Sequence, residues 1–98
     1  MLTEVKLRMG IPAAVTVYDS EISSLISAAL LDLKAAGVPA WLLEDENPDH
    51  RTLAAVTAFT QAYHLTDRTD TEKYKRIYNA WAFRLMLEPE IAPAQTEG

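Results

Sequence analysis

The sequence predicts a small all-α domain of four helices, a short one near the N-terminus followed by three longer ones. In three segments, apolar residues recur at the three- and four-residue spacing of a buried helix face. Glycine or proline stands where helices would end, at Gly10, Gly37 and Pro89. Residues 13–18 are the one β-prone stretch, and no second strand pattern exists for them to pair with. The length of 98 residues fits a single domain.

The first predicted helix covers residues 4–9, with Thr3 as its N-cap. Gly10 and Pro12 end it, because glycine and proline both interrupt a helix. Its inward-facing residues are Leu2, Val5 and Met9. Residues 13–18 then form an extended connector in this interpretation.

The second helix has the clearest pattern and runs from Asp19 to Gly37. Asp19 is a favourable N-cap, and Glu21 places a negative charge where the helix dipole favours one. Gly37 supplies the left-handed position that ends many helices, and Pro39 prevents continuation. The apolar face consists of Ile22, Leu25, Ile26, Ala29, Leu30 and Leu33.

An extended loop separates the second helix from the third. It contains residues 40–43 and then an acidic stretch that ends at Asp49. The third helix begins near Pro48 or Asp49, which can cap it, and runs to about His64. This helix is apolar on two sides, which predicts a central position with partners on both. One face carries Leu53, Val56, Thr60 and Tyr63, and the other Ala55, Phe59 and Ala62.

The fourth helix follows a polar turn and is capped by Thr69 or Asp70. Pro89 closes it, so we expect one domain over residues 1–88 and a flexible acidic tail over residues 89–98. The predicted buried stripe is Tyr74, Ile77, Tyr78, Trp81 and Leu85.

Residues that could carry catalysis or hold a metal are scarce. The chain has no cysteine, which excludes a disulfide scaffold, a cysteine-ligated zinc site and a thiol nucleophile. His50 and His64 lack metal-ligand spacing, and the acidic stretch 44–49 lacks the ligand order of a calcium loop. No serine has a glycine elbow or a nearby base, and three glycines leave no phosphate-binding loop. We therefore expect no enzymatic activity, cofactor or metal.

The net charge of −5 disfavours a general affinity for nucleic acid. No apolar run approaches the roughly 20 residues that span a bilayer, so an acidic, soluble, intracellular protein is expected. Residues 67–84 carry five basic and three acidic side chains, a local charge of +2 that is typical of a solvated helix. The alternative reading is a small helical regulator that binds DNA or a protein, but the long acidic loop before the third helix weighs against it.

Surplus apolar surface is the more informative signal. Leu31 lies about 180° from the buried stripe of its helix, and Phe83 and Leu87 fall off the stripe of theirs. The connector Trp41, Leu42 and Leu43 lies outside any regular amphipathic helix. Uncovered apolar clusters mark contact surfaces, so these positions are candidates for subunit or partner contacts. The alternative is that the connector folds back over the core and Phe83 packs beneath it.

The order and spacing of these elements resemble the tailed-phage head–tail connector proteins, also called head-completion or DNA-packaging adaptors. The run from Tyr18 to Val38 resembles that family's second helix, and the residues from Leu53 to Leu85 resemble its third helix, linking turn and final helix. The opening is also similar, so the resemblance covers nearly the whole chain. The matching positions are Leu2, Thr3, Val5, Lys6, Arg8, Tyr18, Asp19, Ser20, Glu21, Ile22, Leu25, Ile26, Ala28, Ala29, Asp32, Leu33, Gly37, Val38, Leu53, Val56, Ala58, Phe59, Ala62, Tyr63, Asp70, Lys73, Tyr74, Tyr78, Trp81 and Leu85.

The resemblance implies a structural virion protein of a phage or prophage, present in the bacterial host cytoplasm before assembly. Such adaptors form a ring beneath the portal protein, extend the DNA channel and dock the next tail-completion protein. We expect Leu31 and the Trp41–Leu43 connector to lie in one subunit contact and the Phe83–Leu87 end in the other. An acidic channel wall formed by Glu44, Asp45 and Glu46 would repel DNA and let it slide without sequence-specific binding.

Overall fold

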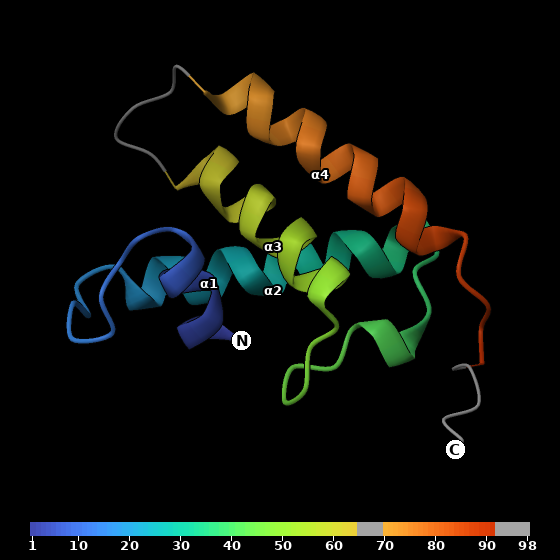
Figure 1. Cartoon of the computed structure of the whole chain (residues 1–98), viewed down its shortest axis with the longest axis horizontal. Helices are drawn as coiled ribbons and strands as arrows, with labels where there is room; N and C mark the ends of the chain where they lie inside the picture. The colour runs from blue at the N-terminus through green and yellow to red at the C-terminus, as the bar shows by residue number, and fades with distance from the viewer. Residues whose placement is uncertain (65–69, 92–98) are drawn as a thin grey trace.

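A computed structural model describes residues 1–64 and 70–91, and these residues form four α-helices and one 3-10 turn without a strand, which confirms the all-α prediction. The chain is elongated, with extents of 42 × 28 × 19 Å. The elements in chain order (Figure 1) are α1 (Leu2–Arg8), α2 (Asp19–Ala36), η1 (Ala40–Leu42), α3 (His50–Tyr63) and α4 (Thr71–Met86).

Helix α3 occupies the centre of the fold, as its two apolar sides predict. It packs extensively against α4 on one side and α2 on the other, whereas α2 and α4 touch only slightly (Figure 1). Its buried residues are Thr52, Leu53, Ala55, Val56, Thr57, Ala58, Thr60 and Ala62. The hydroxyls of two buried threonines are hydrogen-bonded: Thr52 donates to the Leu42 carbonyl of η1 at 2.7 Å, and Thr60 donates to the Val56 carbonyl of the same helix at 2.8 Å. Tyr63, expected on a buried face, is half exposed at the helix end.

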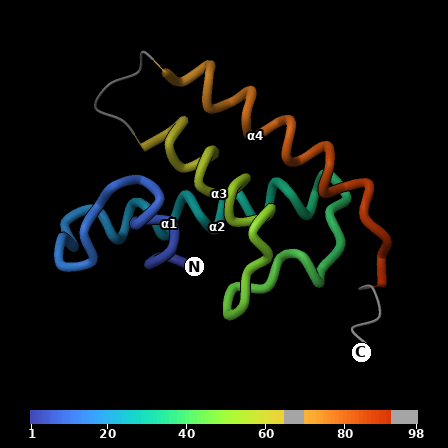
Figure 2. The backbone as a smooth tube through the Cα atoms, viewed as in Figure 1, coloured from blue at the N-terminus to red at the C-terminus, as the bar shows by residue number. Residues whose placement is uncertain are grey.

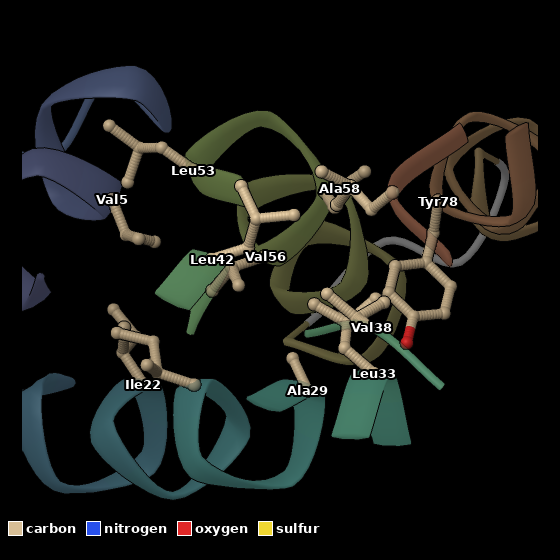
Figure 3. Packing of buried hydrophobic residues seen from close by; sticks show 13 residues of the cluster. Val5, Ile22, Ala29, Leu33, Val38, Leu42, Leu53, Val56, Ala58 and Tyr78 are labelled. Carbon is tan, nitrogen blue, oxygen red and sulfur yellow. The ribbon is translucent and has the colours of Figure 1, made fainter. Parts of the chain in front are cut away.

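The hydrophobic core lies where α3 meets the other elements (Figure 3). Val5 enters it from α1, Ile22 and Leu33 from α2, and Leu42 from η1; all four are fully buried. Leu85 closes the core from α4 and is also fully buried. Each such side chain contributes about 1.5–3 kcal/mol relative to an exposed one, so the protomer has a core of its own.

The helix ends agree only in part with the predicted caps. Gly37 ends α2 in the left-handed conformation with φ 103°, and the Asp49 carboxylate accepts a hydrogen bond from the Arg51 amide at the start of α3, as predicted. Thr3 does not cap α1, which already begins at Leu2. Asp19 is the first residue of α2 and makes no cap bond, because its carboxylate lies 2.7 Å from Lys6 Nζ instead.

Residues 9–18 form compact turns, so the prediction of an extended connector is wrong (Figure 2). The Val15 amide donates to the Pro12 carbonyl at 3.0 Å, and the Asp19 amide donates to the Thr16 carbonyl at 3.1 Å. Lys6 is buried beneath this loop, and its ammonium also donates to the Val15 carbonyl at 2.6 Å. Within the described residues the loop has no partner strand, and the buried ammonium group of Lys6 instead binds its carbonyl groups.

The buried stripe of α4 is narrower than predicted. Tyr78 and Leu85 are buried, Tyr74 and Trp81 are partly buried, and Ile77 is exposed. The reason is that α4 packs chiefly on α3 and so covers a single narrow side. Of the predicted tail 89–98, residues 92–98 lie outside the described residues.

Candidate interaction surfaces

The outward side of α4 carries a cluster of large apolar side chains near its C-terminal end. Phe83 is 60% exposed and Leu87 is 68% exposed, although Leu85 between them is fully buried. Met86 adds a further exposed apolar side chain. The guanidinium of Arg84 lies over the Trp81 ring, 5.4 Å from its centroid. Because its side chain is mostly exposed, Phe83 does not pack beneath the connector.

The outward side of α2 carries Leu31, which is 67% exposed. Its exposed neighbours one turn away in each direction are Ala28 and Ala35, so Leu31 stands above a face of small residues. The carboxylates of Glu21 and Asp32 border this face and are exposed as well. Leu31 thus lies opposite the buried stripe of α2, as its helical phase predicts.

The connector between α2 and α3 packs into the protomer. Leu42 is fully buried, and its carbonyl accepts the hydrogen bond from the Thr52 hydroxyl, so its side chain lies inside the protomer and not on a surface for another subunit, contrary to the expectation. Trp41 and Leu43 pack against the core and are partly buried. The Trp41 indole donates to the Pro89 carbonyl at 2.8 Å, which ties the connector to the segment after α4.

A second link holds the segment after α4 in place. Arg51 at the start of α3 lies 3.0 Å from a carboxylate oxygen of Glu88 and 2.9 Å from one of Asp49. The hydrogen bond from the Arg51 side chain holds the pKa of Asp49 below its ordinary value. Arg51 therefore stabilises both the N-terminus of α3 and the exit from α4.

The acidic stretch Glu44, Asp45 and Glu46 is exposed to solvent, where the sequence places it. One of its members is not free, because Asp45 lies 2.7 Å from the α-amino group of Met1. This hydrogen bond raises the pKa of the amino group. Glu44 and Glu46 remain as exposed charges beside it.

A cavity of about 310 Å³ opens between the helices near the end of α3. Its lining residues are Asp32, Phe59, Ala62, Tyr63, Lys75, Tyr78 and Asn79. The Tyr78 hydroxyl donates to Asp32, and burial together with this bond raises the pKa of Tyr78. This hydrogen bond joins α2 to α4 across the cavity, so the polar residues of the cavity have a structural role.

The described residues contain neither a metal-binding cluster nor a membrane-spanning helix. Residues 1–64 and 70–91 contain no group of three or more His, Asp or Glu side chains that could hold a metal ion. Within the same residues, no helix is both long and apolar enough to cross a membrane. His64 lies 2.8 Å from Glu21 and edge-on to Tyr18, where it connects the ends of α3 and α2.

Residues 1–91 match the family described as phage connector protein. The chain belongs to the phage connector protein family. Membership confirms the resemblance inferred from the helix pattern and supports a structural role in the phage particle rather than an enzymatic one. Comparison with curated proteins and with solved structures gives no match.

This phage connector protein also exposes apolar residues that the sequence reasoning missed. Val17 in the loop before α2 is 77% exposed, and Leu7 on α1 is 63% exposed. The only sequence signal in this region is the β-prone run 13–18. A local β preference does not predict which side chains of the loop are exposed once the loop is bonded to the buried Lys6. These residues lie on the side of the molecule where Lys6 holds the loop.

Proposed function

We propose that this phage connector protein assembles as a ring under the portal, where it extends the DNA channel and docks tail-completion proteins. The subunits accumulate in the cytoplasm of the bacterial host before they join the virion. Membership of the family supports this proposal. The single observation that carries it is that Leu31, Phe83 and Leu87 are all more than half exposed on helices whose opposite sides form the core.

The placement of these residues favours a ring over a closed dimer. Leu31 lies on the outer side of α2, whereas Phe83 and Leu87 lie on the outer side of α4, and these two helices contact each other only slightly. A contact between two different surfaces repeats from copy to copy and closes into a ring when the rotation allows.

The acidic loop supports the channel part of the proposal. Glu44 and Glu46 are exposed, and a negative wall repels the phosphate backbone instead of binding it. DNA would then pass through the ring without sequence-specific contact.

Complementation of a phage that lacks this gene tests the contact residues. The Phe83→Ser and Leu87→Ser variants remove apolar surface that the core does not use, so folded protein is expected while infectious titre falls at least tenfold. The measurement is plaque titre, together with the amount of connector in purified particles. Leu7→Ser removes an equally exposed leucine from α1 and serves as the control. Normal titre and normal incorporation of the Phe83 and Leu87 variants would contradict the proposal.

The channel role is tested by replacing Glu44, Asp45 and Glu46 with lysine. Lysines on the channel wall would bind phosphates, so DNA packaging or ejection is expected to slow or stall although the connector is incorporated. The measurement is DNA release from purified particles over time. The triple replacement with glutamine is the control, because it removes charge without adding attraction. Unchanged packaging and ejection by the lysine variant would contradict the channel role.

A further inference from the structure

We infer that the outer face of α4 in one copy packs on the outer face of α2 in the next copy. This inference rests on the proposed ring and names the partner of each exposed surface. The α4 patch consists of Ala80, Phe83, Met86 and Leu87. The α2 face consists of Ser24, Ala28, Leu31 and Ala35.

Helical geometry places the members of each set together. Successive residues of an α-helix turn by about 100°, so residues three and four apart share one face. Both sets follow this spacing and are exposed, and the buried residues of the same helices lie on the other side. Each helix therefore presents a second, unpartnered side.

The shapes of the two surfaces are complementary. Three of the four α4 residues are large, whereas three of the four α2 residues are small. Large side chains that pack against small ones let two helix axes approach to about 8–10 Å. The one large residue of the α2 face, Leu31, would fit beside Ala80, the one small residue of the α4 patch.

The charges are also complementary. Four basic and one acidic side chain give α4 a charge of +3, whereas three acidic and one basic side chain give α2 a charge of −2. Exposed Arg76 and Arg84 border the α4 patch. Glu21 and Asp32 lie at one edge of the α2 face, where each also contacts its own protomer, Glu21 through His64 and Asp32 through the Tyr78 hydroxyl. Opposite charges around an apolar centre orient the encounter and disfavour pairing of α4 with α4.

The connector is not needed for this contact. Trp41 already bonds to the Pro89 carbonyl, and Leu43 packs against the core of its own protomer. The segment after α4 is likewise held by Arg51 and Glu88, which fixes the end of α4 on the protomer. The subunit contact is thus assigned to two helices that are already rigid.

Disulfide trapping tests the pairing. The sequence contains no cysteine, so every disulfide that forms involves an introduced cysteine. Two chains are compared in assembled particles, one with Leu31→Cys and Phe83→Cys and the other with Leu31→Cys and Ala80→Cys. A disulfide needs Cα atoms within about 7 Å, so mild oxidation is expected to give a ladder of cross-linked multimers with at least one of the two chains. The three single-cysteine chains are the controls and are expected to stay monomeric.

The outcomes separate this pairing from the ring itself. Particles that contain the normal amount of connector but show no ladder with either chain would overturn the pairing and leave the ring standing. Dimers from a single-cysteine chain would overturn it too, because they show a surface that meets its own copy. Wild-type connector that is missing from purified particles would instead refute the proposed function.

A steric variant adds an independent measurement. Ala28→Trp places a bulky ring on the α2 face, whereas Ser23→Trp places it on an exposed side of the same helix away from that face. Both variants are expected to keep the wild-type circular dichroism spectrum and thermal midpoint. Ala28→Trp is expected to lower connector incorporation at least tenfold, and Ser23→Trp to leave it unchanged. Equal incorporation of the two variants would contradict the pairing.

Discussion

Lys6 is the residue whose environment differs most from the expectation for its type. Lysine is almost never fully buried unless it is paired, and Lys6 is 3% exposed. Its ammonium lies 2.7 Å from an Asp19 oxygen and also donates to the carbonyls of Ala13 and Val15. These three partners belong to the loop and to the start of α2, so one cation joins three segments. The spacing of residues in the sequence does not predict the burial of Lys6, because that burial depends on where the loop folds back over α1.

The first prediction concerns this lysine. Lys6→Met keeps the apolar stem but leaves one carboxylate and two carbonyls without their donor. Breaking a buried pair costs about 3–5 kcal/mol, and partial solvent access to Asp19 reduces the expected loss to about 2–3 kcal/mol. The measurement is urea unfolding followed by circular dichroism. Arg8→Met, on the exposed side of the same helix, is expected to change stability by less than about 0.5 kcal/mol. Equal stability of the two variants would show that the lysine contacts are unimportant.

The helices and their order follow from local chemistry, because their signals act within one turn. Gly37 takes a positive φ that other residues avoid, and the Asp49 side chain bonds an amide two residues away. The width of the buried stripe on a helix, in contrast, cannot be predicted from such local signals. Ile77 has the correct phase to be buried but is exposed, because the packing of α4 on α3 decides how much of each side is covered.

The start of α3 gives a prediction for stability and its pH dependence. Asp49→Ala removes the cap and the partner of Arg51, so a loss of about 1–2 kcal/mol is expected at neutral pH. The pKa of Asp49 is lowered in the folded state, so its contribution is present above the unfolded pKa and is lost as pH falls through the folded pKa. The difference between wild type and variant should therefore shrink below about pH 4.

Asp70 provides the matched control for this prediction. It occupies the same position before α4 but makes no side-chain cap bond. Asp70→Ala is expected to cost less than about 0.5 kcal/mol, because no cap bond is lost. Thermal unfolding of the three proteins between pH 3 and pH 7 makes the comparison. A difference for Asp49→Ala that grows toward low pH would refute the assigned direction.

At the scale of the whole molecule, the sequence predicts part of the candidate surfaces. Leu31, Phe83 and Leu87 are exposed, as their phase relative to the buried stripes indicates. Leu42 has no helical phase to read, and its burial depends on a connector that folds back onto α3. The exposure of Val17 equally depends on a tertiary contact, the one that Lys6 makes with its loop.

The symmetry of assembly can be tested with two variants that each lose one surface. Leu31→Lys disables the α2 face and Phe83→Lys disables the α4 patch, and neither side chain belongs to the core, so both proteins should fold. In a head-to-tail arrangement neither variant can bind its own copy, because every contact needs both surfaces. An equal mixture retains one working pair, the α4 patch of the first variant on the α2 face of the second. Association should therefore stop at a dimer.

Sedimentation velocity, at a concentration where the wild type self-associates, distinguishes the two possible symmetries. Monomers from each variant alone and one-to-one dimers from the mixture are the expected result. If contacts instead joined identical surfaces, each variant would keep one self-pairing surface and would dimerise without the other. Oligomers from either variant alone would thus exclude the head-to-tail contact on which a ring depends. Because exposed Leu31 and Phe83 lie on two different helices, α2 and α4, we expect dimers only in the mixture.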